Sequence, residues 1–122
     1  MYRPFPHARG AESSGATGYR SVTLSGVPRS GLLGTLEVGF SADPGTVIVA
    51  LAHDGDGDAL LTDAVEVTTV QAINSKYSIA VNLHRRPFRY DTDLNTESQL
   101  FLQISTGNSV IVTGRLYIEA VN

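Results

Sequence analysis

From Tyr19 onward, large apolar residues recur at every second position, and this alternation is the feature that most restricts the fold. Leu36, Val38 and Phe40 are one example. Successive side chains of a strand point to opposite faces, so a period of two predicts strands that each turn one face toward a core. The residues expected to form that core are Leu36, Val38, Phe40, Val47, Val49, Leu51, Ile79, Val81, Leu100, Leu102, Ile104, Leu116 and Ile118.

Turn signals rich in glycine, proline, aspartate and asparagine separate these runs. They lie at residues 27–31, 42–45, 53–58 and 106–109. Residues 46–52 are apolar at almost every position, which predicts a central strand covered on both faces. Together the runs predict an all-β fold, namely a single antiparallel β-sandwich, jelly-roll-like, over residues 19–122.

Residues 1–18 are expected to form an extended N-terminal arm. They contain two prolines, three glycines and few large apolar residues, and they show no periodicity. Such a composition forms almost no core of its own, so we expect the sandwich to fold without the arm. The alternative is that the arm lies along its own domain. Aromatic rings among prolines and two cations make four arm residues candidates for partner binding: Tyr2, Arg3, Phe5 and Arg9.

Residues 85–98 form the longest stretch without a strand pattern, and they are expected to be a polar loop. Arginine and aromatic side chains are favoured anchors of protein interfaces. The loop therefore supplies a second set of candidate partner-binding residues: Arg85, Arg86, Phe88 and Arg89. A plain surface loop is the alternative. Nucleic-acid surfaces use the same residue types, but a net charge of −3 and a pI of about 5.5 disfavour that partner.

Charge is distributed unevenly along the chain. Residues 37–66 hold seven acids and no lysine or arginine, whereas residues 1–30 and 85–89 are basic. Patches of opposite sign steer docking between copies or onto a partner, and solvated loops that happen to differ in sign are the alternative.

The segment Asp54 to Asp58 alternates carboxylates with glycines, a pattern that can bind Ca²⁺. It departs from the helix–loop–helix calcium pattern, which needs glycine and glutamate where this chain has Ala59 and Val65. We expect a hairpin loop whose aspartates and glycines make the turn. A weak calcium site formed by Asp54, Asp56 and Asp58 is the alternative.

Nothing in the sequence matches a catalytic or cofactor-binding motif. There is no cysteine, and the three histidines (His7, His53 and His84) lack the close spacing of a zinc site. Neither a Gly-x-Ser-x-Gly elbow nor a Gly-rich phosphate loop occurs. We therefore expect a protein that is not an enzyme and needs no cofactor. No apolar run reaches about 18 residues, so no membrane partner is expected.

Three features together resemble the decoration, or cement, proteins of tailed-bacteriophage capsids. They are the arm Met1 to Gly18, the strand–turn–strand stretch Gly45 to Val67 with its Asp-Gly turn, and the closing strands Leu100 to Val121. The likeness is one of overall pattern. It implies a virion structural protein on the capsid exterior, assembled in the host cytoplasm as a dimer or trimer. Its partners would be the major capsid protein and copies of itself.

The alternative function is a carbohydrate- or receptor-binding sandwich of a viral fibre or spike, with loops in place of an arm as the contact surface. The chain has no tryptophan, the usual platform for a sugar ring, but it has five tyrosines and four phenylalanines.

Overall fold

The described part of the chain consists of strands joined by turns. A computed structural model describes residues 2–3, 7–12, 18–54, 59–67, 71–73, 76–89 and 99–121. The strands are β1 (Tyr2–Arg3), β2 (His7–Glu12), β3 (Gly18–Ser25), β4 (Ser30–Phe40), β5 (Val47–Ala52), β6 (Val65–Val67), β7 (Gln71–Ile73), β8 (Lys76–Arg89), β9 (Gln99–Thr106) and β10 (Val112–Val121). These residues include no helix long and apolar enough to cross a membrane.

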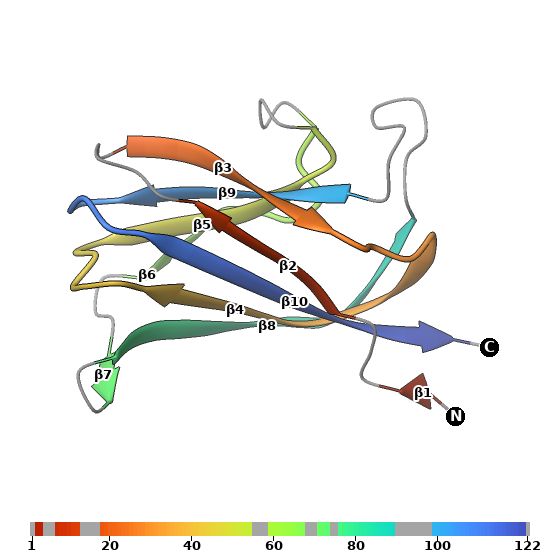
Figure 1. Cartoon of the computed structure of the whole chain (residues 1–122). Coiled ribbons are helices and arrows are strands. Elements are labelled where there is room, and N and C mark those ends of the chain that lie inside the picture. The colour runs from red at the N-terminus through yellow and green to blue at the C-terminus, as the bar shows by residue number, and fades with distance from the viewer. Residues whose placement is uncertain are drawn as a thin grey trace.

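All strand pairs are antiparallel, and the strand order is β6-β5-β9-β3-β2-β10-β4-β8-β7, with β1 also paired to β10. The sheet folds over on itself into two packed layers (Figure 1). We call β6-β5-β9-β3 the β3 layer and β2-β10-β4-β8-β7 the β10 layer. The predicted antiparallel β-sandwich is confirmed.

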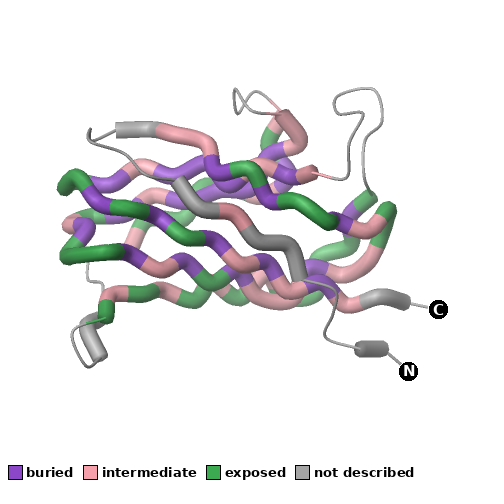
Figure 2. The backbone as a smooth tube through the Cα atoms, viewed as in Figure 1, coloured by how far each residue is buried: buried purple, intermediate pink, exposed green. Residues whose placement is uncertain are grey.

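The core lies between the layers, where the alternation predicted it (Figure 2). Of the expected core residues, all but Ile79 and Val81 are buried. These two are half-buried and pack against the rim of the core. The core also takes in residues outside the expected set: Val22, Leu24, Val27, Leu33, Leu61, Phe88, Val110 and Val112.

Two glycines allow the layers to meet where the sheet folds. Gly10 of β2 lies opposite Gly114 of β10. A Cβ atom on Gly10 would lie 2.0 Å from the Thr23 carbonyl oxygen, and one on Gly114 would lie 2.9 Å from a methyl group of Leu102. Glycine in a strand marks such close approaches of backbone. The β2 strand is joined to β3 by the single pair Arg9 and Ser25, so the fold of the sheet falls there.

The prediction for residues 46–52 is correct for burial and wrong for position. Strand β5 is second from the end of the sheet, beside the three-residue β6. Both its faces are nevertheless covered, since Val47, Leu51 and Ala52 are fully buried and Ala50 almost so. Residues 59–62 lie along its edge, where the Leu61 N–H donates to the Leu51 carbonyl at 2.8 Å.

The predicted loop over residues 85–98 is wrong at its start, because β8 continues to Arg89. The strand is interrupted by a bulge. Leu33 pairs with Arg86 and Thr35 with Asn82, so the single residue Gly34 faces three residues of β8. His84 and Arg85 both have a φ of 55°, in the left-handed region. The bulge therefore re-aims the end of β8. Residues 90–98 lie outside the described part.

The described segments of the N-terminal arm lie along its own domain. Strand β2 pairs with β10 from His7 opposite Tyr117 to Glu12 opposite Val112. Strand β1 adds two pairs at the other end of β10. Folding of the sandwich without this region stays a prediction.

Candidate protein contact surface

The outward side of the β10 layer carries the polar side chains that the alternation leaves out of the core. We define it as the outer face, formed by Glu37, Gly39, Lys76, Ser78, Ala80, Thr113, Arg115 and Tyr117. Paired residues of neighbouring strands share a face, so the register orders these residues in rows. One row is Thr113, Gly39 and Ser78, and the next begins with Arg115 and Glu37.

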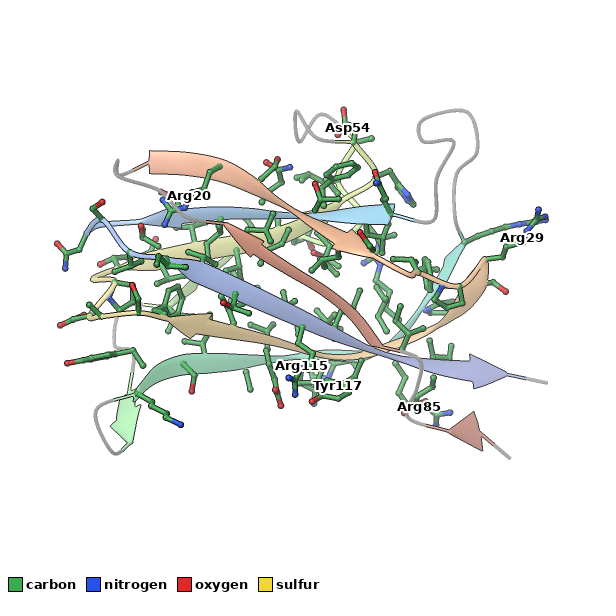
Figure 3. All side chains as sticks on the ribbon, in the orientation of Figure 1. Arg20, Arg29, Asp54, Arg85, Arg115 and Tyr117 are labelled. Atoms are coloured by element: carbon green, nitrogen blue, oxygen red, sulfur yellow. The ribbon has the colours of Figure 1, made fainter. Side chains whose placement is uncertain are left out.

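Three outer-face side chains form one hydrogen-bonded network. Arg115 Nη1 donates to the Tyr117 hydroxyl at 3.1 Å, and that hydroxyl donates to Glu37 Oε2 at 3.5 Å. The hydrogen bond to Tyr117 is the largest of the effects that raise the pKa of Arg115 above its usual value, and the charge of Glu37 adds to it. Figure 3 shows Arg115 and Tyr117 side by side, away from the core. The network holds a cation and an aromatic ring in place on rigid strands.

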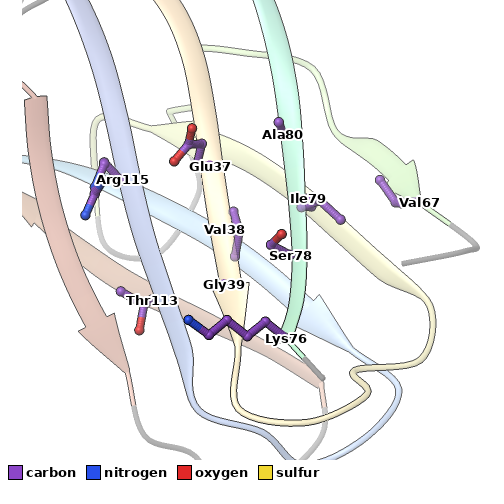
Figure 4. A pocket seen from close by; sticks show the side chains of 10 residues that line it. All are labelled: Glu37, Val38, Gly39, Val67, Lys76, Ser78, Ile79, Ala80, Thr113 and Arg115. Atoms are coloured by element: carbon purple, nitrogen blue, oxygen red, sulfur yellow. The ribbon is translucent and has the colours of Figure 1, made fainter. Parts of the chain in front are cut away.

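A hollow of about 870 Å³ adjoins this network. The hollow is deeper at Gly39, because glycine places no side chain in the row between Thr113 and Ser78. Lys76 extends past Gly39 toward Thr113, while Ile79 points toward Val67 on β6 (Figure 4). The hollow thus combines charged and hydroxyl groups on the outer face with an apolar margin at the edge of β8.

The bulge in β8 presents a second charged pair. Arg85 Nε donates to Glu119 Oε2 at 3.0 Å, and the arginine side chain is 54% exposed while that of the glutamate is 13% exposed. The His84 N–H donates to Asn82 Oδ1 at 2.8 Å and supports the local turn. The left-handed backbone at His84 and Arg85 costs energy that an ordinary strand would not. This backbone turn directs the Arg85 side chain toward Glu119 on β10.

The structure brings the two predicted contact regions to one strand. Arg3 lies opposite Ala120 in the register, and Arg9 lies opposite Arg115. From the other side, Arg85 bonds to Glu119. Tyr2 lies opposite Val121. Arginines far apart in the sequence therefore follow the length of β10.

Three of the remaining predicted contact residues are placed, and one of them leaves the surface. Arg86 and Arg89 are exposed on β8. Phe88 was expected to be a surface anchor, but it is only 6% exposed and belongs to the core. The bulge shifts the inward phase of β8 by one residue, which turns Phe88 inward. Phe5 lies outside the described residues.

The sequence analysis used the apolar positions of the alternation to predict the core. It did not single out the polar positions between them, which form the outer face. Arg115 and Tyr117 occupy the phase opposite to Leu116 and Ile118 on β10. An aromatic ring on the polar phase of a closing strand was the available signal.

Asp54 makes a turn contact in the loop where calcium was considered. Its Oδ1 accepts from the Ala59 N–H at 3.1 Å, a bond that joins the two ends of the loop across five residues. Asp56 and Asp58 lie outside the described residues. Within the described segments, no three histidine, cysteine or carboxylate side chains gather closely enough to hold a metal ion.

Comparison with models of known protein families and with curated proteins finds no match to this chain.

Proposed function

We propose that the chain is a binding and assembly protein that decorates or cements a bacteriophage capsid, docking through the outer face of the β10 layer. The observation that carries the proposal is the Arg115–Tyr117–Glu37 network, which fixes an arginine and a tyrosine on an exposed strand surface. The viral assignment rests on the overall pattern of an N-terminal arm followed by a cysteine-free sandwich.

The residue types support contact with a protein. Tyrosine and arginine are enriched among the residues that carry interface energy, and side chains already held in place lose less entropy on binding. Arg115 and Tyr117 are only partly exposed, and they emerge from β10, which is paired on both sides. The contact is therefore built on a rigid element.

The charges indicate the chemistry of the partner. Lys76, Arg85 and Arg115 outnumber Glu37 and Glu119 among the described side chains on this side, and Arg9 lies beside Arg115 in the register. We therefore expect the docking surface on the major capsid protein to be acidic, because opposite charges favour contact.

The test is co-expression with the capsid genes of the genome that encodes the chain, followed by sedimentation of the shells. We expect the protein to sediment with them. Arg115→Ala should weaken binding at least about tenfold, a loss of about 1.4 kcal/mol. Arg29→Ala is the matched control, because Arg29 is an exposed arginine in the turn between β3 and β4. Equal effects of the two variants would refute docking through this face, and a genome without capsid genes would refute the viral role.

A second candidate function is recognition of a carbohydrate or receptor, favoured by the hollow over Gly39. Its volume lies in the range of small-ligand sites, and its hydroxyl and charged groups suit a polar ligand. A glycan array separates the two: specific binding that Lys76→Ala abolishes supports this candidate over capsid docking.

A further inference from the structure

We infer that two copies of this chain pair through the open edge of β8, around a two-fold axis at Val81, to form a dimer with one continuous sheet. The inference goes beyond the proposed docking to a capsid and specifies the pairing between copies that the sequence analysis expects. It starts from how β8 is paired.

Strand β8 is an edge along most of its length. On one side it pairs with β4 from Tyr77 opposite Phe40 to Arg89 opposite Ser30. On the other side, β7 is its sole partner among the described strands, and β7 covers only residues 76–78. An unpaired edge presents backbone N–H and C=O groups that can template another strand.

Among the residues that the structure describes, the middle of this edge is the part open to pairing. The bulge at His84 and Arg85 bends the strand, and Pro87 lacks an N–H. Bulges, prolines and charges are the devices by which proteins blunt edge strands. Residues 79–83 contain no proline and no charge, and their backbone lies before the left-handed turn at His84 and Arg85. The other end of the sheet is blunted differently, because β6 is three residues long and carries the exposed Glu66.

The open segment is self-complementary. If two β8 edges pair antiparallel with Val81 opposite Val81, then Ile79 lies opposite Leu83 and Ala80 lies opposite Asn82. The half-buried residues Ile79, Val81 and Leu83 already face the rim of the core, and the partner's copies would continue that apolar row. No like charges oppose each other within the segment. A closed two-fold pairing of this kind is the commonest form of oligomer.

The positions of the bulge and of β7 are also compatible with this register. Counting outward from Val81, His84 of one copy comes opposite Ser78 of the other, where β7 begins on that edge. A straight strand would collide with β7 there. Because β8 bulges at His84 and Arg85, each strand leaves the shared ladder at the point where the other copy's β7 closes it. The five-residue ladder is therefore bounded at both ends by the fold itself.

The pairing extends the β10 layer in its own plane. The order becomes β10-β4-β8 followed by β8-β4-β10 of the second copy, and the two outer faces lie on one sheet. A ladder of this length covers less area than the roughly 1,600 Å² of a standard interface, so we expect a reversible dimer.

Analytical ultracentrifugation of the full chain, without any partner, is the test. We expect a dimer that dissociates on dilution. Val81→Lys and Val81→Glu each place like charges opposite one another on the two-fold axis, and each should weaken association at least about tenfold. An equimolar mixture of the two should restore dimers, since lysine then faces glutamate. Val65→Lys is the matched control, because Val65 is an exposed valine on β6, and it should leave association unchanged.

If the charged variants fail to fold, a cysteine variant tests the pairing of the two β8 edges instead. The chain has no cysteine, so Val81→Cys introduces a single thiol. Cα atoms of directly opposed residues lie about 4.5–5.5 Å apart, within the range of a disulfide. Oxidation should cross-link Val81→Cys into a dimer and leave Val65→Cys largely monomeric. A wild-type monomer at all concentrations, or equal cross-linking of both variants, would overturn the inference while leaving capsid docking to the Arg115 test.

Discussion

The two layers of the sandwich differ in how much of each strand is buried. In the β3 layer, β5 and β9 are covered on both faces, and even Gln103 is only 8% exposed, with its side-chain amide donating to Ser21 Oγ and the Asp54 carbonyl. In the β10 layer, β8 has a single buried residue, Phe88. The two inner strands of the first layer are largely covered on both faces, whereas the second layer offers both a polar face and an open edge.

This difference assigns different roles to similar strands. Burial of apolar area supplies most of the stability of a domain, so substitutions in β5 and β9 should act on folding. Groups on the outer face and the β8 edge are partly solvated, so substitutions there should act on contacts. The contrast is open to direct measurement with matched pairs of variants.

The largest effect should come from a leucine pair, one in each layer. Leu102→Ala in β9 removes a fully buried side chain and should lower the free energy of unfolding by about 2–5 kcal/mol. Leu83→Ala removes a half-buried leucine from β8 and should cost less than half as much. Urea denaturation measures both. Equal losses would show that β8 belongs to the core as fully as β9 does.

A glycine pair tests the place where the layers join. Gly10→Val should cost about 1–3 kcal/mol, because its side chain meets the backbone of Thr23 and β2 must move. Gly39→Val should be neutral or stabilising, since a Cβ atom there has its nearest contact at 3.9 Å and valine favours strands. Thermal unfolding of both variants provides the comparison. A harmless Gly10→Val would mean that β2 is a loosely attached part of the arm.

The sequence predicted the core well where strands are regular and failed where they bulge. In β9 the alternation is unbroken, and Leu100, Leu102 and Ile104 are buried as expected. Relative to β10, β4 has one extra residue at Gly34, so Leu33 and Leu36 both face inward although they are three positions apart. An alternating pattern does not continue across such a shift, so the sequence analysis found it only from Leu36 onward.

The contact surface was harder to predict because it depends on pairing. Arg9, Arg85 and Arg115 are far apart in the sequence, and only the strand order β2-β10-β4-β8 brings them together. Arg9 and Arg85 were recognised from the composition of their own segments. Glu37, Arg115 and Tyr117 gain significance only from the register that joins them, which a single sequence does not reveal.

The bulge should hold a smaller amount of strain that glycine can release. His84→Gly replaces a residue with a φ of 55° and should raise stability by about 1 kcal/mol, because glycine adopts that conformation without steric cost. Ala80→Gly, in the regular part of the same strand, should lower it by about 0.5–1 kcal/mol. Opposite signs are the expected result of chemical denaturation. A loss in both variants would mean that other His84 contacts outweigh the backbone strain.

The smallest effect should come from the charged pair beside the bulge. Arg85→Ala removes the ion pair with Glu119, and because Arg85 is 54% exposed we expect a loss of only about 0.2–1 kcal/mol. The loss should shrink as salt is added, since screening weakens the pair in the wild type. Glu119→Ala and the double variant complete a thermodynamic cycle that isolates the coupling between the two side chains. Arg29→Ala, an exposed arginine in a turn, is the control and should change stability less than Arg85→Ala does. A coupling of several kcal/mol would make the pair a structural element of the β10 layer, and the contrast between an enclosed layer and a contact layer would then fail at β10. A coupling near the expected size leaves Arg85 free to exchange Glu119 for an acidic group of a partner.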